Sequence, residues 1–200
     1  MRLFGVVLGE GNGKVGEVIN FSLPSVITCP GASSWCLKKC YADRLEKIRP
    51  ACRRAYQHNL TLARDTRRFI HIMTGVIPRI APCFRIHVSG DFFSREYIEA
   101  WTAICRAFPP IRFWTYTRSW AVPELLPSLL ALRSLPNVHL FASTDPTMPL
   151  PPKGWRTAFI DIDPRANGQL CSEQTGLTES CLACGACFRT EDGNVIFRVH

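Results

Sequence analysis

Seven of the ten cysteines are concentrated in two short segments, and thiols in such groups can do metal chemistry. The first segment holds three thiols within twelve residues, and the second holds four within seventeen. Thiolates are soft ligands, and several that lie close along a chain can converge on one metal centre. A disulfide framework is the alternative, although it is typical of small secreted domains. The two groups are Cys29, Cys36 and Cys40, and Cys171, Cys181, Cys184 and Cys187.

The spacing within the second group predicts the kind of metal. Two residues separate each of its last three cysteines, and the fourth thiol lies nearby at Cys171. Four thiolates from a short loop match the demand of a four-iron cluster, whereas zinc fingers usually have two separated Cys-x2-Cys pairs. The first group has three thiols, so a cluster there has one open iron unless Cys52 is its fourth ligand. The sequence therefore predicts two [4Fe-4S] clusters, with zinc as the alternative metal.

Polar residues occur at the ends of several predicted strands. Ser89-Gly90-Asp91 follows one strand, Thr117-Arg118 closes the next, and Asp145 follows a third. Because the carboxyl ends of parallel strands meet at one edge of a sheet, we expect these residues to lie near the first cysteine group. Asp91 has two interpretations, as a structural carboxylate in a turn and as a group that binds the cationic part of a ligand.

Alternating strands and helices are expected to position these residues. Such alternation implies βαβ units and a parallel sheet. The predicted fold class is α/β, with a partial (β/α) barrel of about five to six mostly parallel strands, because a closed barrel needs eight; an open parallel sheet is the alternative. We expect this barrel over residues 1–163 and a cysteine-rich segment packed on it over residues 164–200. The apolar pattern predicts strands at 15–22, 84–88, 112–118, 138–142 and 158–162, and helices at 38–47 and at 50–77, the second as one long or broken helix. One further helix is predicted to follow Ser94 as its N-cap, and another to begin at Pro123.

The positive charge is concentrated in one part of the chain. Residues 36–85 hold twelve Lys and Arg against three Asp and Glu, whereas the whole chain has a net charge of +8. Such a basic face can attract nucleic acid or a phosphorylated substrate, and it can equally be the solvated side of two helices. No run of 18 apolar residues occurs, and the apolar run before Glu10 is too short for a signal peptide. We therefore expect a cytoplasmic protein that does not enter a membrane.

The motifs resemble those of two known families. The cysteine loop, the Ser89-Gly90-Asp91 turn, the partial barrel and the cysteine-rich tail are similar to those of the radical S-adenosylmethionine superfamily. More closely, the segments His87-Val-Ser-Gly-Asp-Phe-Phe93 and Phe113-Trp-Thr-Tyr-Thr-Arg118, with both cysteine groups, resemble the phage and bacterial gene product 88 family.

The first resemblance implies a cofactor and roles for the site residues. S-adenosylmethionine is implied at the open iron of the first cluster, with its amino group on Asp91 and with Thr117, Arg118 and Asp145 nearby. An auxiliary cluster on the second cysteine group and an electron donor such as a ferredoxin or flavodoxin are implied as well. We thus expect a radical enzyme, and the alternative is a non-catalytic iron–sulphur or zinc protein that binds nucleic acid or responds to redox change.

Overall fold

The computed structural model describes residues 1–11, 16–77, 83–189 and 193–199, and within them nine strands form one sheet in the order β1-β2-β3-β4-β5-β6-β7-β9-β8. From β3 to β8 every neighbouring pair is parallel, whereas β1 and β2 run antiparallel at the other edge. The strands are β1 (Arg2–Leu3), β2 (Val6–Gly9), β3 (Asn20–Phe21), β4 (Cys83–Ile86), β5 (Arg112–Thr117), β6 (Val138–Ser143), β7 (Arg156–Ile160), β8 (Gln169–Leu170) and β9 (Val195–Phe197).

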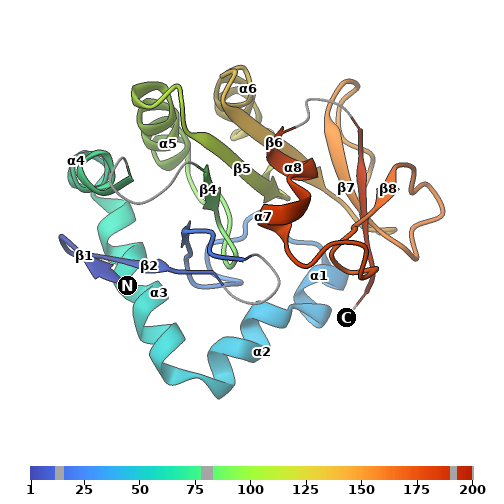
Figure 1. Ribbon diagram of the computed structural model, residues 1–200, viewed down its shortest axis with the longest axis horizontal. Coiled ribbons are helices and arrows are strands. Elements are labelled where there is room, and N and C mark those ends of the chain that lie inside the picture. Colours follow the sequence, from blue (N-terminus) through green and yellow to red (C-terminus); the bar gives the residue numbers. More distant parts are fainter. Residues whose placement is uncertain (12–15, 78–82, 190–192, 200) are drawn as a thin grey trace.

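This sheet confirms the mixed α/β class and its parallel character, but the predicted partial barrel is not present. The sheet is open, with β1 at one edge and β8 at the other (Figure 1). Closure requires the first parallel strand to approach the last, and β3 is instead covered on its outer side by the antiparallel strand β2. The tail contributes β8 and β9 to the same sheet. The division at residue 163 stays a prediction.

The helices begin where local sequence signals place them. Pro50 is the first residue of its helix, since its fixed φ suits that position and it lacks the N–H that the first turn leaves unpaired. The Ser94 side chain accepts a hydrogen bond from the Tyr97 N–H and caps the next long helix. The helices are α1 (Ser34–Lys39), α2 (Tyr41–Ile48), α3 (Pro50–Arg64), α4 (Thr66–Val76), α5 (Arg95–Ala107), α6 (Leu126–Arg133), α7 (Cys181–Cys184) and α8 (Ala186–Arg189).

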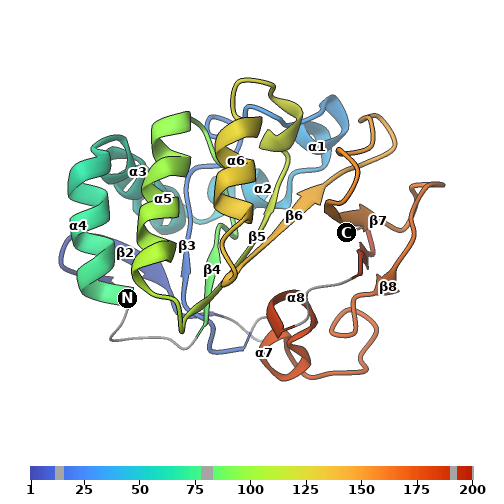
Figure 2. The same ribbon diagram turned by 90° about the horizontal axis from the view of Figure 1, so that it is seen from above.

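Both faces of the sheet are covered by helices. On one face α4, α5 and α6 lie side by side, and α7 and α8 lie at the other side of the molecule (Figure 2). Successive residues of β5 show the two faces directly, because side chains alternate along a strand. Phe113 packs against Phe84 in the larger core, whereas Trp114 stacks on Phe188 of α8 with ring centroids 4.6 Å apart.

The larger core is aromatic and lies beneath α4 and α5. Phe21, Phe69 and Trp101 are fully buried and their ring centroids lie 5.2 to 5.9 Å apart, in tilted and edge-on arrangements that aromatic pairs favour. This core fixes the strands whose carboxyl ends carry the predicted site. Within the described ranges, no helix combines the length and apolar character that a bilayer crossing needs.

Two of the predicted features fall partly outside the described residues. The predicted strand at 15–22 begins at Val15, and its described part contains β3. Arg79, one of the twelve cations in the 36–85 window, also lies outside the described ranges.

Candidate functional site

The carboxyl end of the parallel sheet is tied together by Asp91. Its Oδ1 accepts hydrogen bonds from the Phe92 N–H at 2.7 Å and the Thr117 hydroxyl at 2.6 Å, and its Oδ2 accepts from the Arg118 N–H at 2.8 Å. Asp91 is buried, and burial raises its pKa while these hydrogen bonds act in the opposite direction. The carboxylate therefore joins the loop after β4 to the end of β5, a contact between distant residues and not the local turn or helix cap that the structural interpretation expected.

A second carboxylate carries this connection onwards to α1. Asp145, fully buried after β6, accepts from the Arg118 guanidinium at 2.5 Å and from the Ser33 hydroxyl at 2.6 Å. The Ser33 hydroxyl also accepts from the Cys36 N–H and so caps α1. Burial raises the pKa of Asp145, but the hydrogen bonds from Ser33 and Thr147 and the charge of Arg118 lower it below its usual value. The network from Asp91 to Ser33 therefore fixes where α1 begins.

The sequence predicted four of these residues together and missed the fifth. Asp91, Thr117, Arg118 and Asp145 meet at one edge, whereas Ser33 lies 112 residues from its partner. A serine directly before a helix is a recognised capping signal, so Ser33 could have been identified as a cap but not as a partner of Asp145.

The predicted residues Ser89 and Gly90 serve a neighbouring contact. The Ser89 hydroxyl donates to Glu46 of α2 at 3.1 Å, and Glu46 also accepts from the Ser25 N–H at 2.8 Å. Gly90 has a φ of 79°, a conformation that favours glycine, and an added Cβ would lie 2.6 Å from Leu23 and Thr28. This turn therefore holds α2 against the sheet.

The first cysteine group lies beside this network. Burial raises the pKa of the Cys29 thiol to about 12, and the negative charge of Asp91 adds to that increase. Burial also raises the pKa of Cys36, although the charge of Arg118 partly opposes it. The Cys40 sulphur accepts from the Asp43 N–H at 3.4 Å and caps α2. Cys29 and Cys36 are therefore protonated near neutral pH, and a protonated thiol is a weak nucleophile.

The second cysteine group lies on the α8 side of the sheet. Burial raises the pKa of Cys181 to about 11 and also raises that of Cys187, which accepts a hydrogen bond from the Tyr116 hydroxyl. Arg85 lies 5.5 Å from the centre of the Tyr116 ring. Cys187 packs with Trp114 and Phe188 in a small apolar cluster. Cys171, Cys181 and Cys187 are thus half-buried residues that pack against small apolar clusters.

The geometry overturns the predicted iron–sulphur function. Across the described ranges, which include all ten cysteines, no three or more His, Cys, Asp or Glu side chains are placed so that they could hold a metal ion. For two of these sulphurs the physical reason is visible, because Cys40 caps α2 and Cys187 lies beside the Tyr116 hydroxyl. The prediction of a two-cluster protein is therefore wrong, both as a radical enzyme and as a non-catalytic iron–sulphur or zinc protein. S-adenosylmethionine itself is not tested by these observations and stays a prediction.

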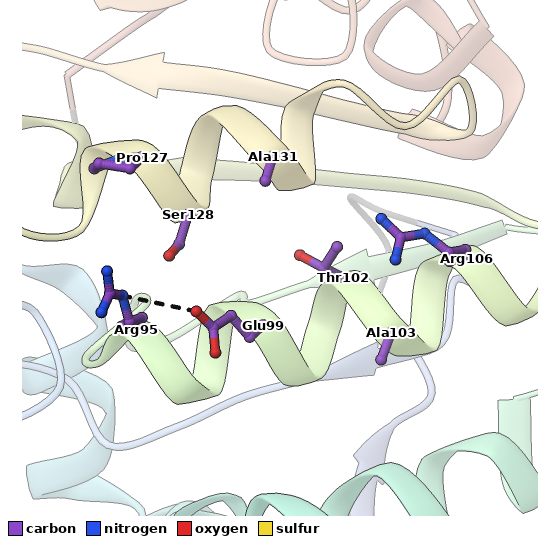
Figure 3. Close-up of a pocket in the computed structure, with 8 residues that line it drawn as sticks. All are labelled: Arg95, Glu99, Thr102, Ala103, Arg106, Pro127, Ser128 and Ala131. Carbon is purple, nitrogen blue, oxygen red and sulfur yellow. Dashed lines mark ion pairs between the residues drawn. The ribbon is translucent and has the colours of Figure 1, made fainter.

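Two cavities lie away from the carboxyl edge. One of about 330 Å³ is a groove between α5 and α6, where Arg95 and Glu99 form an ion pair of 3.7 Å at one end (Figure 3). The other, of about 820 Å³, lies at the amino ends of β6 and β7 and is lined by Arg133 and Trp155 among others. Neither cavity is lined by a residue that the sequence predicted for the site.

The surface carries a concentration of positive charge that we call the basic face. We define it as the ten exposed Lys and Arg side chains on α1 to α4 and on the residue that connects α2 to α3. The four helices follow one another in a band around one side of the molecule (Figure 1). The ten residues are Lys38, Lys39, Arg44, Lys47, Arg49, Arg53, Arg54, Arg64, Arg67 and Arg68.

Little negative charge lies among these cations. Of the three acidic residues in the predicted window, Glu46 is buried against Ser25 and Ser89, which leaves Asp43 and Asp65. Within the described part of the chain, Lys47 is the member of the basic face that makes an ion pair, at 2.6 Å from Asp43. The other nine cations are therefore available to an anionic partner.

Acidification tests the ionic contacts at the carboxyl edge. Asp163 has a pKa below its usual value because Arg165 donates hydrogen bonds to it, so the fold binds fewer protons there than the unfolded chain does. Stability from this pair is fully present above the usual pKa near 4 and is lost as pH falls from there through the lower pKa of the folded state. We expect Asp163→Asn to be less stable than wild type at about pH 7, with a difference that shrinks towards about pH 3. Urea unfolding of both proteins across this pH range measures the difference in stability. A difference that stays constant with pH would contradict a stabilising ion pair between Asp163 and Arg165.

Comparison with known proteins finds a matching family model and two similar proteins from phages. The family model described as Gene product 88 matches residues 8–153, which include the carboxyl-edge network and the basic face. The Gene 88 protein of Mycobacterium phage L5 is 36% identical over 169 residues, covering 76% of this chain and 69% of that protein. The Gene 88 protein of Mycobacterium phage D29 is 34% identical with the same coverage. No solved structure matches this chain, and the resemblance to the radical S-adenosylmethionine superfamily receives no support.

Proposed function

The chain belongs to the gene product 88 family, and for this member of it we propose that the basic face of α1 to α4 binds nucleic acid. The observation that carries the proposal is the ten exposed cations, of which Lys47 is the one seen in an ion pair within the described residues. Phosphate neutralisation by Lys and Arg, with release of counterions, supplies most of the affinity in nucleic-acid binding that does not depend on sequence.

The cations project outwards because of the helical pattern. On α3 the side chains of Arg53, Arg54 and Arg64 are exposed, whereas Leu62 and Ala63 are buried on the side that faces the protein. On α4, likewise, Arg67 and Arg68 are exposed and the next residue, Phe69, is buried.

The dimensions of α3 suit a phosphate backbone. Arg64 lies eleven positions after Arg53, a distance of about 16 Å along a helix that rises about 1.5 Å per residue. Phosphates repeat every ~3.4 Å along the axis of one strand of duplex DNA, so this stripe reaches about five of them. Several simultaneous phosphate contacts are therefore available from α3 alone.

The carboxyl-edge residues have a supporting role in this proposal. Asp91, Arg118 and Asp145 form the network that ends at Ser33, the cap of α1. We assign to them the positioning of the first helix of the basic face. With the clusters rejected, the predicted electron donor has no role here.

Neutralisation of one helix face, with a matched control, tests the proposal. In the triple variant Arg53→Ala/Arg54→Ala/Arg64→Ala, we expect the affinity for a labelled oligonucleotide to fall by about tenfold or more. The slope of log affinity against log salt should become shallower by about two to three. The control Arg106→Ala/Arg112→Ala/Lys153→Ala removes three exposed cations elsewhere and should change affinity by less than about twofold. Fluorescence anisotropy measures the affinity of both variants. Equal losses of affinity would contradict the assignment of nucleic-acid binding to α3.

The same assay separates nucleic acid from a small phosphorylated substrate, the other partner that the charge predicts. A nucleic acid that follows the band of helices should bind more tightly as its length increases, until the basic face is covered. A phosphorylated small molecule would compete fully with short and long oligonucleotides alike. A cytoplasmic location, as the sequence predicts, would bring the basic face into contact with phage and host nucleic acid.

A further inference from the structure

Large apolar side chains are exposed within the same segment that carries the basic face. Five of them occur between residues 26 and 48, on the loop before α1 and on α1 and α2. Exposed apolar groups beside cations differ from an ordinary solvated helix, whose outward side is polar. The five side chains are Val26, Ile27, Leu37, Tyr41 and Ile48.

The outward side of α2 combines both kinds of side chain. Tyr41, Arg44 and Ile48 are spaced at i, i+3 and i+7, which places them on one face, and Lys47 lies beside them. Tyr41 is 48% exposed and Ile48 is 76% exposed, so this face is not covered by the rest of the chain. On the opposite side of α2, Ala42 and Glu46 are buried, and Glu46 accepts hydrogen bonds from Ser25 and Ser89.

The ring of Tyr41 is held in place although it is exposed. Its hydroxyl donates to the carbonyl oxygen of Val88 at 2.6 Å, at the turn that follows β4. A ring fixed at one end loses little conformational freedom when a flat partner stacks on it. The exposed part of Tyr41 is therefore a preformed stacking surface next to the cations of α2.

We propose that α1 and α2 bind single-stranded nucleic acid, with a base stacked on Tyr41 and the backbone held by Arg44 and the neighbouring lysines. This inference rests on the proposed function and specifies its ligand. Proteins that bind single strands combine a cationic path for the backbone with aromatic rings for the bases, whose faces are hidden inside a duplex. The juxtaposition of Tyr41 with Arg44 on one helix face supplies both parts.

A lipid surface is the alternative occupant, and the distribution of charge disfavours it. A helix that lies in a membrane interface has its apolar residues on one side and its cations on the other. On α2 the cation Arg44 lies between Tyr41 and Ile48 on a single face. Such mixing suits a ligand that is itself both charged and aromatic.

The experiment compares a labelled single strand of about 15 nucleotides with its own duplex at equal salt. We expect the single strand to bind about tenfold or more tightly than the duplex. Tyr41→Ala should weaken single-strand binding about tenfold without changing the salt slope, because stacking releases few counterions. Tyr41→Phe keeps the ring but loses the hydrogen bond to Val88, so its affinity should lie between those of wild type and Tyr41→Ala. Ile48→Ala removes a more exposed side chain that has no π face and should change affinity less than about threefold.

The possible results of this experiment distinguish failure of the single-strand inference from failure of the proposed function. Equal affinity for single strand and duplex, with Tyr41→Ala unaffected, overturns this inference while the proposed function stands. Absence of binding to either form overturns the proposed function and the inference with it. Binding to vesicles of anionic lipid that Ile48→Ala abolishes, together with no preference for single strands, overturns the inference in favour of a membrane surface.

Discussion

Replacement of Asp91 by alanine is expected to lower the free energy of unfolding by about 3–5 kcal/mol, because it leaves three buried donors without an acceptor. Those donors are the N–H groups of Phe92 and Arg118 and the hydroxyl of Thr117. An unpaired buried donor costs about 1–3 kcal/mol, and the three effects are not fully additive.

A graded series makes this expectation measurable by urea unfolding even where the alanine variant folds poorly. Asp91→Asn keeps the acceptor oxygen but sets an amide donor against the Arg118 N–H, so it should cost less than Asp91→Ala and still be clearly destabilising. Asp43→Ala removes a half-buried carboxylate at the surface that is paired with the exposed Lys47 and should cost less than about 1 kcal/mol. If Asp91→Ala were no more destabilising than Asp43→Ala, the network would not be what holds the carboxyl edge together.

Replacement of Gly31 by alanine should be the second large effect, at about 3 kcal/mol of lost stability. A Cβ at this position would lie 2.0 Å from the carbonyl oxygen of Arg118 and 2.8 Å from the Ser119 N atom. Both contacts are to backbone, which cannot turn aside as a flexible side chain can. The loop that carries Cys29 must then separate from the turn after β5, which displaces Ser33 from Asp145.

The matched control for Gly31 is Gly75, which lies within α4 with no atom within 4 Å of an added Cβ. Gly75→Ala should raise the free energy of unfolding by about 0.5–1 kcal/mol, because alanine restricts the unfolded chain and favours a helix. Thermal or urea unfolding of both variants gives the comparison. A Gly31→Ala variant as stable as wild type would show that the loop does not need this close approach.

Features that depend on neighbouring residues could be predicted from the sequence. Pro50 at the start of α3 and Ser94 as the cap of α5 are confirmed, because both signals act within one helical turn. The start of α6 was placed three residues early, since the helix begins at Leu126 and not at Pro123. The short strands β1, β2, β8 and β9 were missed because two to four residues carry no recognisable alternation.

Features that depend on distant residues could not be predicted in the same way. An open sheet and a partial barrel have the same strand and helix pattern, and what separates them is which strands lie at the edges. The spacing of cysteines shows how many thiols lie close along the chain, but it does not show what each sulphur contacts. Cys40 and Cys187, for example, contact the Asp43 N–H and the Tyr116 hydroxyl. The basic face, by contrast, could be predicted from composition. A concentration of Lys and Arg in one part of the sequence can be counted without knowledge of what each side chain contacts.

The central claim, that the basic face binds nucleic acid, is tested most directly by the salt dependence of wild-type affinity for a single-stranded oligonucleotide. Each phosphate neutralised contributes about 0.7 to the slope of log affinity against log salt. With at least about four phosphates in contact, the account predicts a slope of about −3 or steeper. Undetectable binding at low salt, or an affinity that does not change with salt, would contradict it.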